Sequence, residues 1–141
     1  MKQCQLTIPG VVYAGPGSVE KINEVLQREK AQSVLLFTDK AVRGAGLTKR
    51  VEEICSAVKL TVIDDLASEP SYQDVERVID EVSVANIDLV IGVGGGSVMD
   101  AAKLASIVIG ADYGVRDLLK NPTIAKKYIK SLMIPTTCGT G

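Results

Sequence analysis

The run Val90-Ile91-Gly92-Val93-Gly94-Gly95-Gly96-Ser97-Val98-Met99-Asp100-Ala101-Ala102-Lys103 decides the fold of this chain. It joins an apolar strand to a helix of small residues through three consecutive glycines. Because glycine lacks a Cβ, an anion can come close to the main chain, and the N–H groups and dipole of the following helix favour negative charge. The run therefore predicts a strand-to-helix turn that binds phosphate, with Ser97 as the helix cap and Asp100 as its capping-box partner.

This glycine turn matches neither of the two common nucleotide-binding patterns. In Gly92-x-Gly94-x-x-Ser97 the last position of the dinucleotide fingerprint is a serine, and the motif follows a late strand rather than the first one. The Gly-Lys-Ser/Thr ending of a P-loop does not occur here either. A tight turn that binds no ligand therefore remains an alternative.

Strand-like apolar runs alternate with helical periodicities along the chain. This alternation predicts an α/β fold, a Rossmann-like parallel sheet flanked by helices. The predicted strands cover residues 6–8, 11–13, 33–38, 60–63, 87–93 and 131–134, and the predicted helices cover 18–26, 47–58, 71–82 and 97–109. Residues 112–122 are predicted to be a polar connection.

Length, composition and charge narrow the classes of protein to which this chain can belong. A length of 141 residues suits one domain, and an apolar content of 46% with only 4% aromatic residues is typical of the aliphatic core of a parallel sheet. The formal net charge of −1 argues against nucleic acid or an anionic membrane as a partner. Nothing approaches the roughly 20 apolar residues of a membrane span, and the basic-then-apolar pattern of a secretory signal is missing.

The cysteine and histidine contents narrow the possible location and chemistry of the protein further. Cys4, Cys55 and Cys138 are odd in number and far apart, which predicts no disulfide framework and a cytoplasmic location. The chain has no histidine, so a histidine-based metal site or acid–base catalyst cannot lie within it. Since the sequence stops at Gly141 inside a second glycine-rich loop, we expect it to be part of a longer protein.

Polar residues follow three of the predicted strands and so share the carboxyl edge of the sheet. Asp39 can accept hydrogen bonds from the ribose hydroxyls of an adenosine and repel a 2′-phosphate, which favours NAD over NADP. A helix N-cap for residues 40–42 is an equal alternative for this carboxylate. The loop 136–141 offers hydroxyl and backbone donors to a phosphate or carboxamide, or it is simply a polar loop.

Other reactive side chains have simpler interpretations. Cys138 has no histidine to activate it, so an unreactive thiol is expected. Asp100 and Lys103 lie one helical turn apart and can pair with each other. Asp64 and Asp65 are adjacent and are predicted to face solvent.

Four stretches of the chain together resemble the iron-containing (group III) alcohol dehydrogenases. They are Gly15-Pro16-Gly17-Ser18, Thr38-Asp39-Lys40, residues 94–103 and residues 134–141, in the family's order and at similar spacing. The resemblance implies that residues 1–141 are a nicotinamide dinucleotide-binding domain, truncated, with the helical metal-binding domain absent. Two positions depart from the family: Ser68-Glu69-Pro70 stands where the family often has Pro-Asn-Pro near the adenine, and Cys138 stands where alanine is common.

The resemblance also implies a reaction and a set of contacts. The reaction is reversible hydride transfer between a small-molecule alcohol or aldehyde and NAD(H), with NADP possible, in a homo-oligomeric enzyme. Fe(II) or Zn(II) would be held by an aspartate and three histidines beyond Gly141, so this chain alone is expected to be inactive. The implied cofactor-binding residues are Asp39, Gly94, Gly95, Gly96, Ser97, Asp100, Thr136, Thr137 and Thr140.

Two alternative hypotheses remain open. One is a glycerol or glycerol-phosphate dehydrogenase or a dehydroquinate-synthase-like enzyme, although glycerol dehydrogenases tend to carry lysine where this chain has Ser97. The other is a non-enzymatic nucleotide-binding module.

Overall fold

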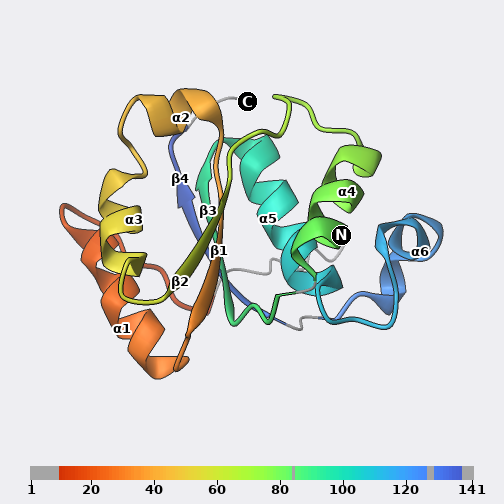
Figure 1. Cartoon of the computed structure of the whole chain (residues 1–141), viewed down its shortest axis with the longest axis horizontal. Helices are drawn as coiled ribbons and strands as arrows, with labels where there is room; N and C mark the ends of the chain where they lie inside the picture. Colours follow the sequence, from red (N-terminus) through yellow and green to blue (C-terminus); the bar gives the residue numbers. More distant parts are fainter. Residues whose placement is uncertain (1–9, 84, 127–128, 138–141) are drawn as a thin grey trace, which may run out of the picture.

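Four parallel strands form one sheet in the order β2-β1-β3-β4 in the computed structural model (Figure 1). The strands are β1 (Ser33–Phe37), β2 (Lys59–Ile63), β3 (Leu89–Gly94) and β4 (Lys130–Pro135). The structure describes residues 10–83, 85–126 and 129–137. The predicted α/β class and parallel sheet are confirmed.

Strand β1 lies inside the sheet, between β2 and β3. Phe37 pairs with Ile63 of β2 on one side and with Gly92 of β3 on the other. The chain therefore runs outward from β1 to β2, then returns past β1 to form β3. Because every strand is parallel, all of the carboxyl ends meet at one edge of the sheet.

Helices cover both faces of the sheet (Figure 1). On one face lie α1 (Lys21–Arg28) and α3 (Lys49–Cys55), and on the other lie α4 (Tyr72–Val82) and α5 (Gly96–Val108). The shorter elements are η1 (Ser18–Glu20), α2 (Lys40–Gly44), α6 (Val115–Lys120) and η2 (Pro122–Ile124).

The two helical layers enclose two apolar cores. Leu35 and Phe37 of β1 pack in the core beneath α4 and α5, whereas Val34 and Leu36 pack in the core beneath α1 and α3. Because β1 is buried on both faces, its sequence is continuously apolar rather than alternating. At about 25 cal/mol per Å² of apolar area, this two-sided burial is the main favourable term in folding.

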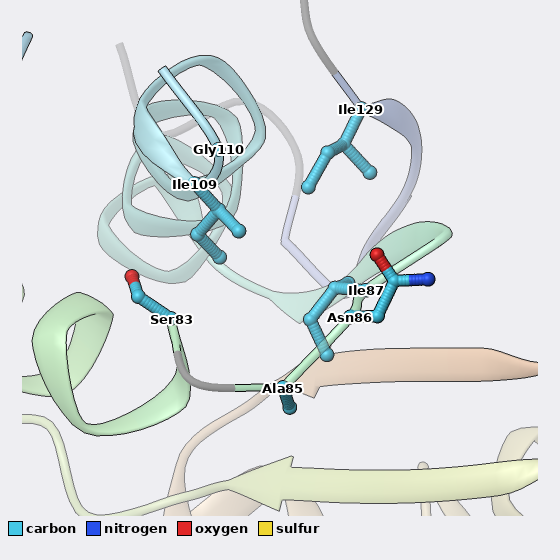
Figure 2. A pocket seen from close by; sticks show the side chains of 7 residues that line it. All are labelled: Ser83, Ala85, Asn86, Ile87, Ile109, Gly110 and Ile129. Carbon is cyan, nitrogen blue, oxygen red and sulfur yellow. The ribbon is translucent and has the colours of Figure 1, made fainter. Parts of the chain in front are cut away.

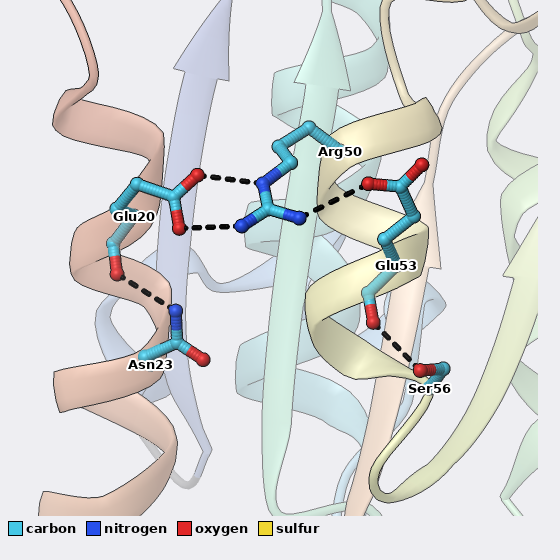
Figure 3. Close-up of polar contacts among 5 residues, drawn as sticks. All are labelled: Glu20, Asn23, Arg50, Glu53 and Ser56. Atoms are coloured by element: carbon cyan, nitrogen blue, oxygen red, sulfur yellow. Dashed lines mark hydrogen bonds and ion pairs between the residues drawn. The ribbon is translucent and has the colours of Figure 1, made fainter.

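Arg50 links the first helical layer across its surface (Figure 3). Its guanidinium donates two hydrogen bonds to Glu20, at 2.6 and 2.8 Å, and one to Glu53 at 3.0 Å. The side-chain hydrogen bond from Arg50 lowers the pKa of Glu20. This exposed network ties α3 to the segment that follows Gly17, although solvent screening keeps its contribution to stability small.

Several predicted elements differ from the structure. Residues 11–13 are not a strand, and the predicted strand 6–8 lies outside the described residues. The predicted helix 18–26 divides into η1, whose N-cap is Gly17 with φ 77°, and α1. The predicted helix 47–58 is confined to α3, and the polar connection 112–122 contains α6. Within the described ranges, no helix is long and apolar enough to cross a membrane.

Candidate functional site

The candidate site lies at the carboxyl edge, where β1 and β3 are neighbours. The chain leaves β1 toward α2 and β2, and it leaves β3 toward α5 and β4, so the two connections diverge from adjacent strands. In open α/β sheets this divergence opens the crevice in which ligands bind. Asp39 follows β1, and the three glycines end β3.

Helix α5 begins within the glycine run. Gly95 is the N-cap in an extended conformation, and no side chain caps the helix. The predicted cap at Ser97 with Asp100 as its partner is therefore wrong, because the helix starts at Gly96 and Ser97 already lies in its first turn. The first intrahelical bond runs from Met99 N–H to the Gly95 carbonyl at 3.0 Å. The N–H groups of residues 96–98 precede it and have no intrahelical partner.

The glycines of this run have two distinct physical roles. A Cβ at Gly92 would lie 2.9 Å from the Cβ of Ala102, and one at Gly94 would lie 2.9 Å from the Cβ of Val98, so both positions are small for internal packing. A Cβ at Gly95 would meet only ordinary contacts, and one at Gly96 would meet nothing within 4 Å. Neither Gly95 nor Gly96 has positive φ. Packing and backbone conformation therefore leave these last two glycines unexplained.

The threonine loop lies beside the glycine turn. Thr136 N–H donates to the Gly94 carbonyl at 3.0 Å, and Thr137 Oγ1 would lie 3.6 Å from a Cβ at Gly95. Both threonines are exposed. The structure thus brings the Thr137 hydroxyl and the Thr136 backbone beside the glycines, whereas the predicted contact Thr140 and the thiol of Cys138 lie outside the described residues.

Asp39 is a helix N-cap. Its Oδ1 accepts a hydrogen bond from Val42 N–H at 2.8 Å, which begins α2. In the described part of the chain its second carboxylate oxygen has no hydrogen-bond partner. Two residues beyond the Phe37–Gly92 pair, Asp39 stands level with Gly94 of the neighbouring strand. The cap therefore leaves one oxygen available at the same edge.

Asp100 lies farther along α5 and is exposed. Its side chain is 80% exposed, and Oδ1 lies 4.0 Å from Lys103 Nζ, which confirms the predicted pairing. Ser97 is half-buried and stands one turn earlier, next to the free N–H groups.

Arg43 forms a cluster that local sequence did not indicate. Its guanidinium donates to Asp64 Oδ2 at 2.6 Å and to both carboxylate oxygens of Glu52 at 3.1 Å. The prediction that Asp64 faces solvent is thus wrong, because this carboxylate is half-buried and ion-paired. The partner lies 21 residues away in the chain, so no local spacing could reveal it.

One hollow lies at the opposite, amino edge of the sheet (Figure 2). It measures about 470 Å³ and is lined by Ser83, Ala85, Asn86, Ile87, Ile109, Gly110 and Ile129. These side chains include no charged group, and the one hydroxyl among them, of Ser83, donates to the Ile79 carbonyl. Cys55 is fully buried, and burial raises its pKa to about 11, so it is an unreactive thiol.

No metal centre forms within the part of the chain that the structure describes. No group of three or more Cys, Asp or Glu side chains gathers there closely enough to hold an ion.

Comparison with known proteins agrees with this architecture. The family model of iron-containing alcohol dehydrogenases matches residues 9–141. Long-chain-alcohol dehydrogenase 1 of Geobacillus thermodenitrificans is 32% identical over all of this chain, which covers 37% of that protein. Sulfoacetaldehyde reductase of Bilophila wadsworthia is 27% identical over 96% of this chain, which covers 35% of it.

A solved structure shows the same fold. The sulfoacetaldehyde reductase of Bifidobacterium kashiwanohense, solved in complex with NAD⁺, superimposes with a TM-score of 0.78 at 23% identity, over 89% of this chain and 34% of that one. The present chain thus spans about a third of the length of its relatives. With the family model matching all but its first eight residues, the chain belongs to the iron-containing alcohol dehydrogenases.

Proposed function

We propose that this chain binds the nicotinamide dinucleotide of an enzyme that transfers hydride reversibly between an alcohol and NAD. The proposal rests on the room for a side chain at Gly95 and Gly96. Neither packing nor backbone conformation requires a glycine at these two positions. A ligand that approaches the main chain closely explains both glycines. The free N–H groups at the start of the 13-residue helix α5 favour a ligand that carries negative charge.

The residues present fit a dinucleotide at three points. The diphosphate would lie over Gly94, Gly95, Gly96 and Ser97, where backbone N–H groups and one hydroxyl donate hydrogen bonds. Thr136 and Thr137 would donate to a neighbouring phosphate or carboxamide oxygen, together with Thr140. The free oxygen of Asp39 would accept from the adenosine ribose, while the other oxygen keeps its bond to Val42.

Asp100 is a weaker candidate for a cofactor contact. Its exposed carboxylate lies beyond the helix start and pairs with Lys103, and it has no hydrogen bond to make with a diphosphate, whose oxygens are acceptors too. We propose that Asp100 acts on the cofactor only through its charge near the helix start, without a hydrogen bond.

The bound nicotinamide supplies the hydride chemistry, which this chain's residues do not. Their work is to hold the dinucleotide in place and to shield one side of it from water. Because the described residues include no acidic cluster suited to a cation, we propose that the iron of this family is held by residues outside this chain. There it would act as a Lewis acid on the alcohol oxygen.

The names of the relatives do not agree on one substrate. They include a long-chain-alcohol dehydrogenase, a sulfoacetaldehyde reductase and an NADH-dependent butanol dehydrogenase. We therefore propose only the class, a small alcohol or its aldehyde. We also propose that the enzyme is a homo-oligomer in the cytoplasm, a location favoured by cysteines that are odd in number and far apart in the sequence.

Calorimetric titration of the protein at its natural length with NADH tests the proposal. Gly96→Val places a branched side chain in the open space and is expected to weaken NADH binding about a hundredfold, the loss of several hydrogen bonds to a charged group. Gly114→Val, at the N-cap of the remote helix α6, is the matched control and is expected to bind NADH normally. Normal NADH affinity in Gly96→Val would refute the proposed diphosphate site.

A further inference from the structure

Arg43 is held by two carboxylates from different elements. Glu52 of α3 accepts from Nε and Nη2, and Asp64, directly after β2, accepts from Nη1. Thr48 donates to the same Glu52 at 2.7 Å. All three nitrogens of the guanidinium are thus engaged, although its side chain is still 40% exposed. The cluster can therefore exchange partners without opening the core.

Arg43 also stands one helical turn from Asp39. Its N–H donates to the Asp39 carbonyl at 2.9 Å, so both residues belong to the first turn of α2. Asp39 is the N-cap with extended backbone, and Arg43 lies in the turn that follows, so both residues belong to the same short segment. A cation is therefore already present within reach of the ribose that Asp39 is proposed to bind.

The surrounding charge is negative. Thr38 N–H donates to the Ile63 carbonyl at 2.9 Å, so Asp64 and Asp65 follow β2 beside Asp39. Asp65 is exposed and has no ion-pair or hydrogen-bond partner within the described ranges. With Asp39 itself, three carboxylates follow the ends of the neighbouring strands β1 and β2.

We propose that Arg43 is a specificity-determining residue of this corner. Its capture by Glu52 and Asp64 withholds from the cofactor the guanidinium that would otherwise bind a 2′-phosphate, and so adds to the preference for NAD. The inference rests on the proposed function. Arginine binds phosphate in a bidentate manner, and in dinucleotide-binding folds a nearby arginine accommodates the 2′-phosphate of NADP. The preference is thus set by ion pairing around Arg43 as well as by the charge of Asp39.

The test measures dissociation constants for NADPH and NADH in an Asp39→Asn background, which keeps the cap but removes its charge. Asp64→Ala and Asp65→Ala each remove one neighbouring carboxylate, but only Asp64→Ala frees a nitrogen of Arg43. We expect Asp64→Ala to tighten NADPH binding about tenfold more than Asp65→Ala, as one charge-assisted hydrogen bond predicts. NADH binding should be equal in the two variants.

A second pair of variants shows whether Arg43 or Lys40 is the cation that binds the 2′-phosphate. Adding Arg43→Gln to the Asp39→Asn, Asp64→Ala protein should abolish the gain in NADPH affinity, whereas adding Lys40→Gln, which removes the exposed cation beside Asp39, should preserve it. Equal effects of the two alanine variants, or loss of the gain only with Lys40→Gln, would overturn the inference. Where Asp64→Ala lowers the melting temperature too far, Glu52→Gln frees Arg43 from the other side and should give the same NADPH gain.

The failure of this inference differs from the failure of the proposed function. A parent protein that binds neither nucleotide contradicts the proposed function and removes the basis for a role of Arg43. A parent protein that binds NADH, with NADPH affinity that does not respond to Asp64→Ala, contradicts the role of Arg43 alone.

Discussion

Gly92 of β3 faces Ala102 of α5 so closely that a Cβ at position 92 would lie 2.9 Å from the Cβ of Ala102. It would also lie 3.0 Å from Met133 Sδ of the neighbouring strand. Two residues of the smallest kind therefore let α5 pack directly on β3. This close packing sets the height of the α5 N-terminus above the sheet edge.

We expect Gly92→Ala to destabilise the protein by about 1–3 kcal/mol, because the added methyl group overpacks a contact that cannot relax freely. Gly96→Ala is its matched counterpart and should change stability by less than about 1 kcal/mol, because its Cβ enters open space. Urea unfolding followed by circular dichroism measures both changes. Equal losses in the two variants would contradict the division between packing glycines and ligand glycines.

The two oxygens of Asp39 allow its two roles to be separated. Asp39→Ala removes the acceptor for Val42 and should cost about 1 kcal/mol of stability, whereas Asp39→Asn keeps an acceptor and should cost far less. Both remove the charge that opposes a 2′-phosphate, so both should raise the ratio of NADPH to NADH affinity. Thermal unfolding and nucleotide titration measure the two properties, and an unchanged affinity ratio in both variants would leave Asp39 as a cap only.

Asp88 stabilises the opposite edge of the sheet. Its Oδ2 accepts hydrogen bonds from the N–H groups of Gln32 at 2.8 Å and Ser33 at 3.0 Å, which satisfies the start of β1. We expect Asp88→Ala to lower the free energy of unfolding by about 1–3 kcal/mol, since it leaves these donors unpaired. NADH affinity should not change, because this edge lies far from the glycine turn (Figure 1). A parallel loss of NADH affinity at unchanged fold would contradict this separation of the two edges.

The capping box of α4 gives a pH dependence. Hydrogen bonds from the Ser71 side chain and backbone hold the pKa of Asp74 below its ordinary value of 3.8. Because the folded protein binds this proton less readily, the stabilising contribution is complete above pH 3.8 and is lost as the pH falls through the lower folded value. The stability advantage of wild type over Asp74→Asn should therefore decrease on acidification, as measured by urea unfolding at pH 6 and at pH 3. A constant advantage would contradict the link.

The sheet was predictable because its signals are local. The apolar runs around Leu35 and Val90 are too short for membrane spans and too apolar for surface helices, and alternation with helices makes a parallel sheet the economical solution. The capping box at Ser71 was predictable for the same reason, since its partner Asp74 lies three residues away.

The cap of α5 was predicted wrongly because propensity favours serine over glycine. Gly95 takes the extended conformation of an N-cap, so the helix starts one residue before Ser97. Helix α6 was missed because its surroundings are polar, although Asp117 accepts a hydrogen bond from Gly114 N–H at 3.0 Å and marks the helix start. Its local signal was present but weak.

Non-local contacts were beyond sequence reasoning. The pairing of Arg43 with Asp64 depends on how α2 sits against the end of β2, which no spacing encodes. Residues 11–13 have strand-forming side chains but no strand conformation, because a strand exists only with a partner. The assignments of the dinucleotide contacts stay predictions until a nucleotide is titrated.

The interior position of β1 has a consequence for how the chain folds. Ser33 must find Lys59, and Val34 must find Leu89, before both edges of this strand are paired. No hairpin can nucleate such a sheet, so each pairing first incurs the entropy loss of closing a long loop. We expect slow refolding through collapsed, aggregation-prone intermediates. The yield of refolded protein should therefore fall as the protein concentration rises.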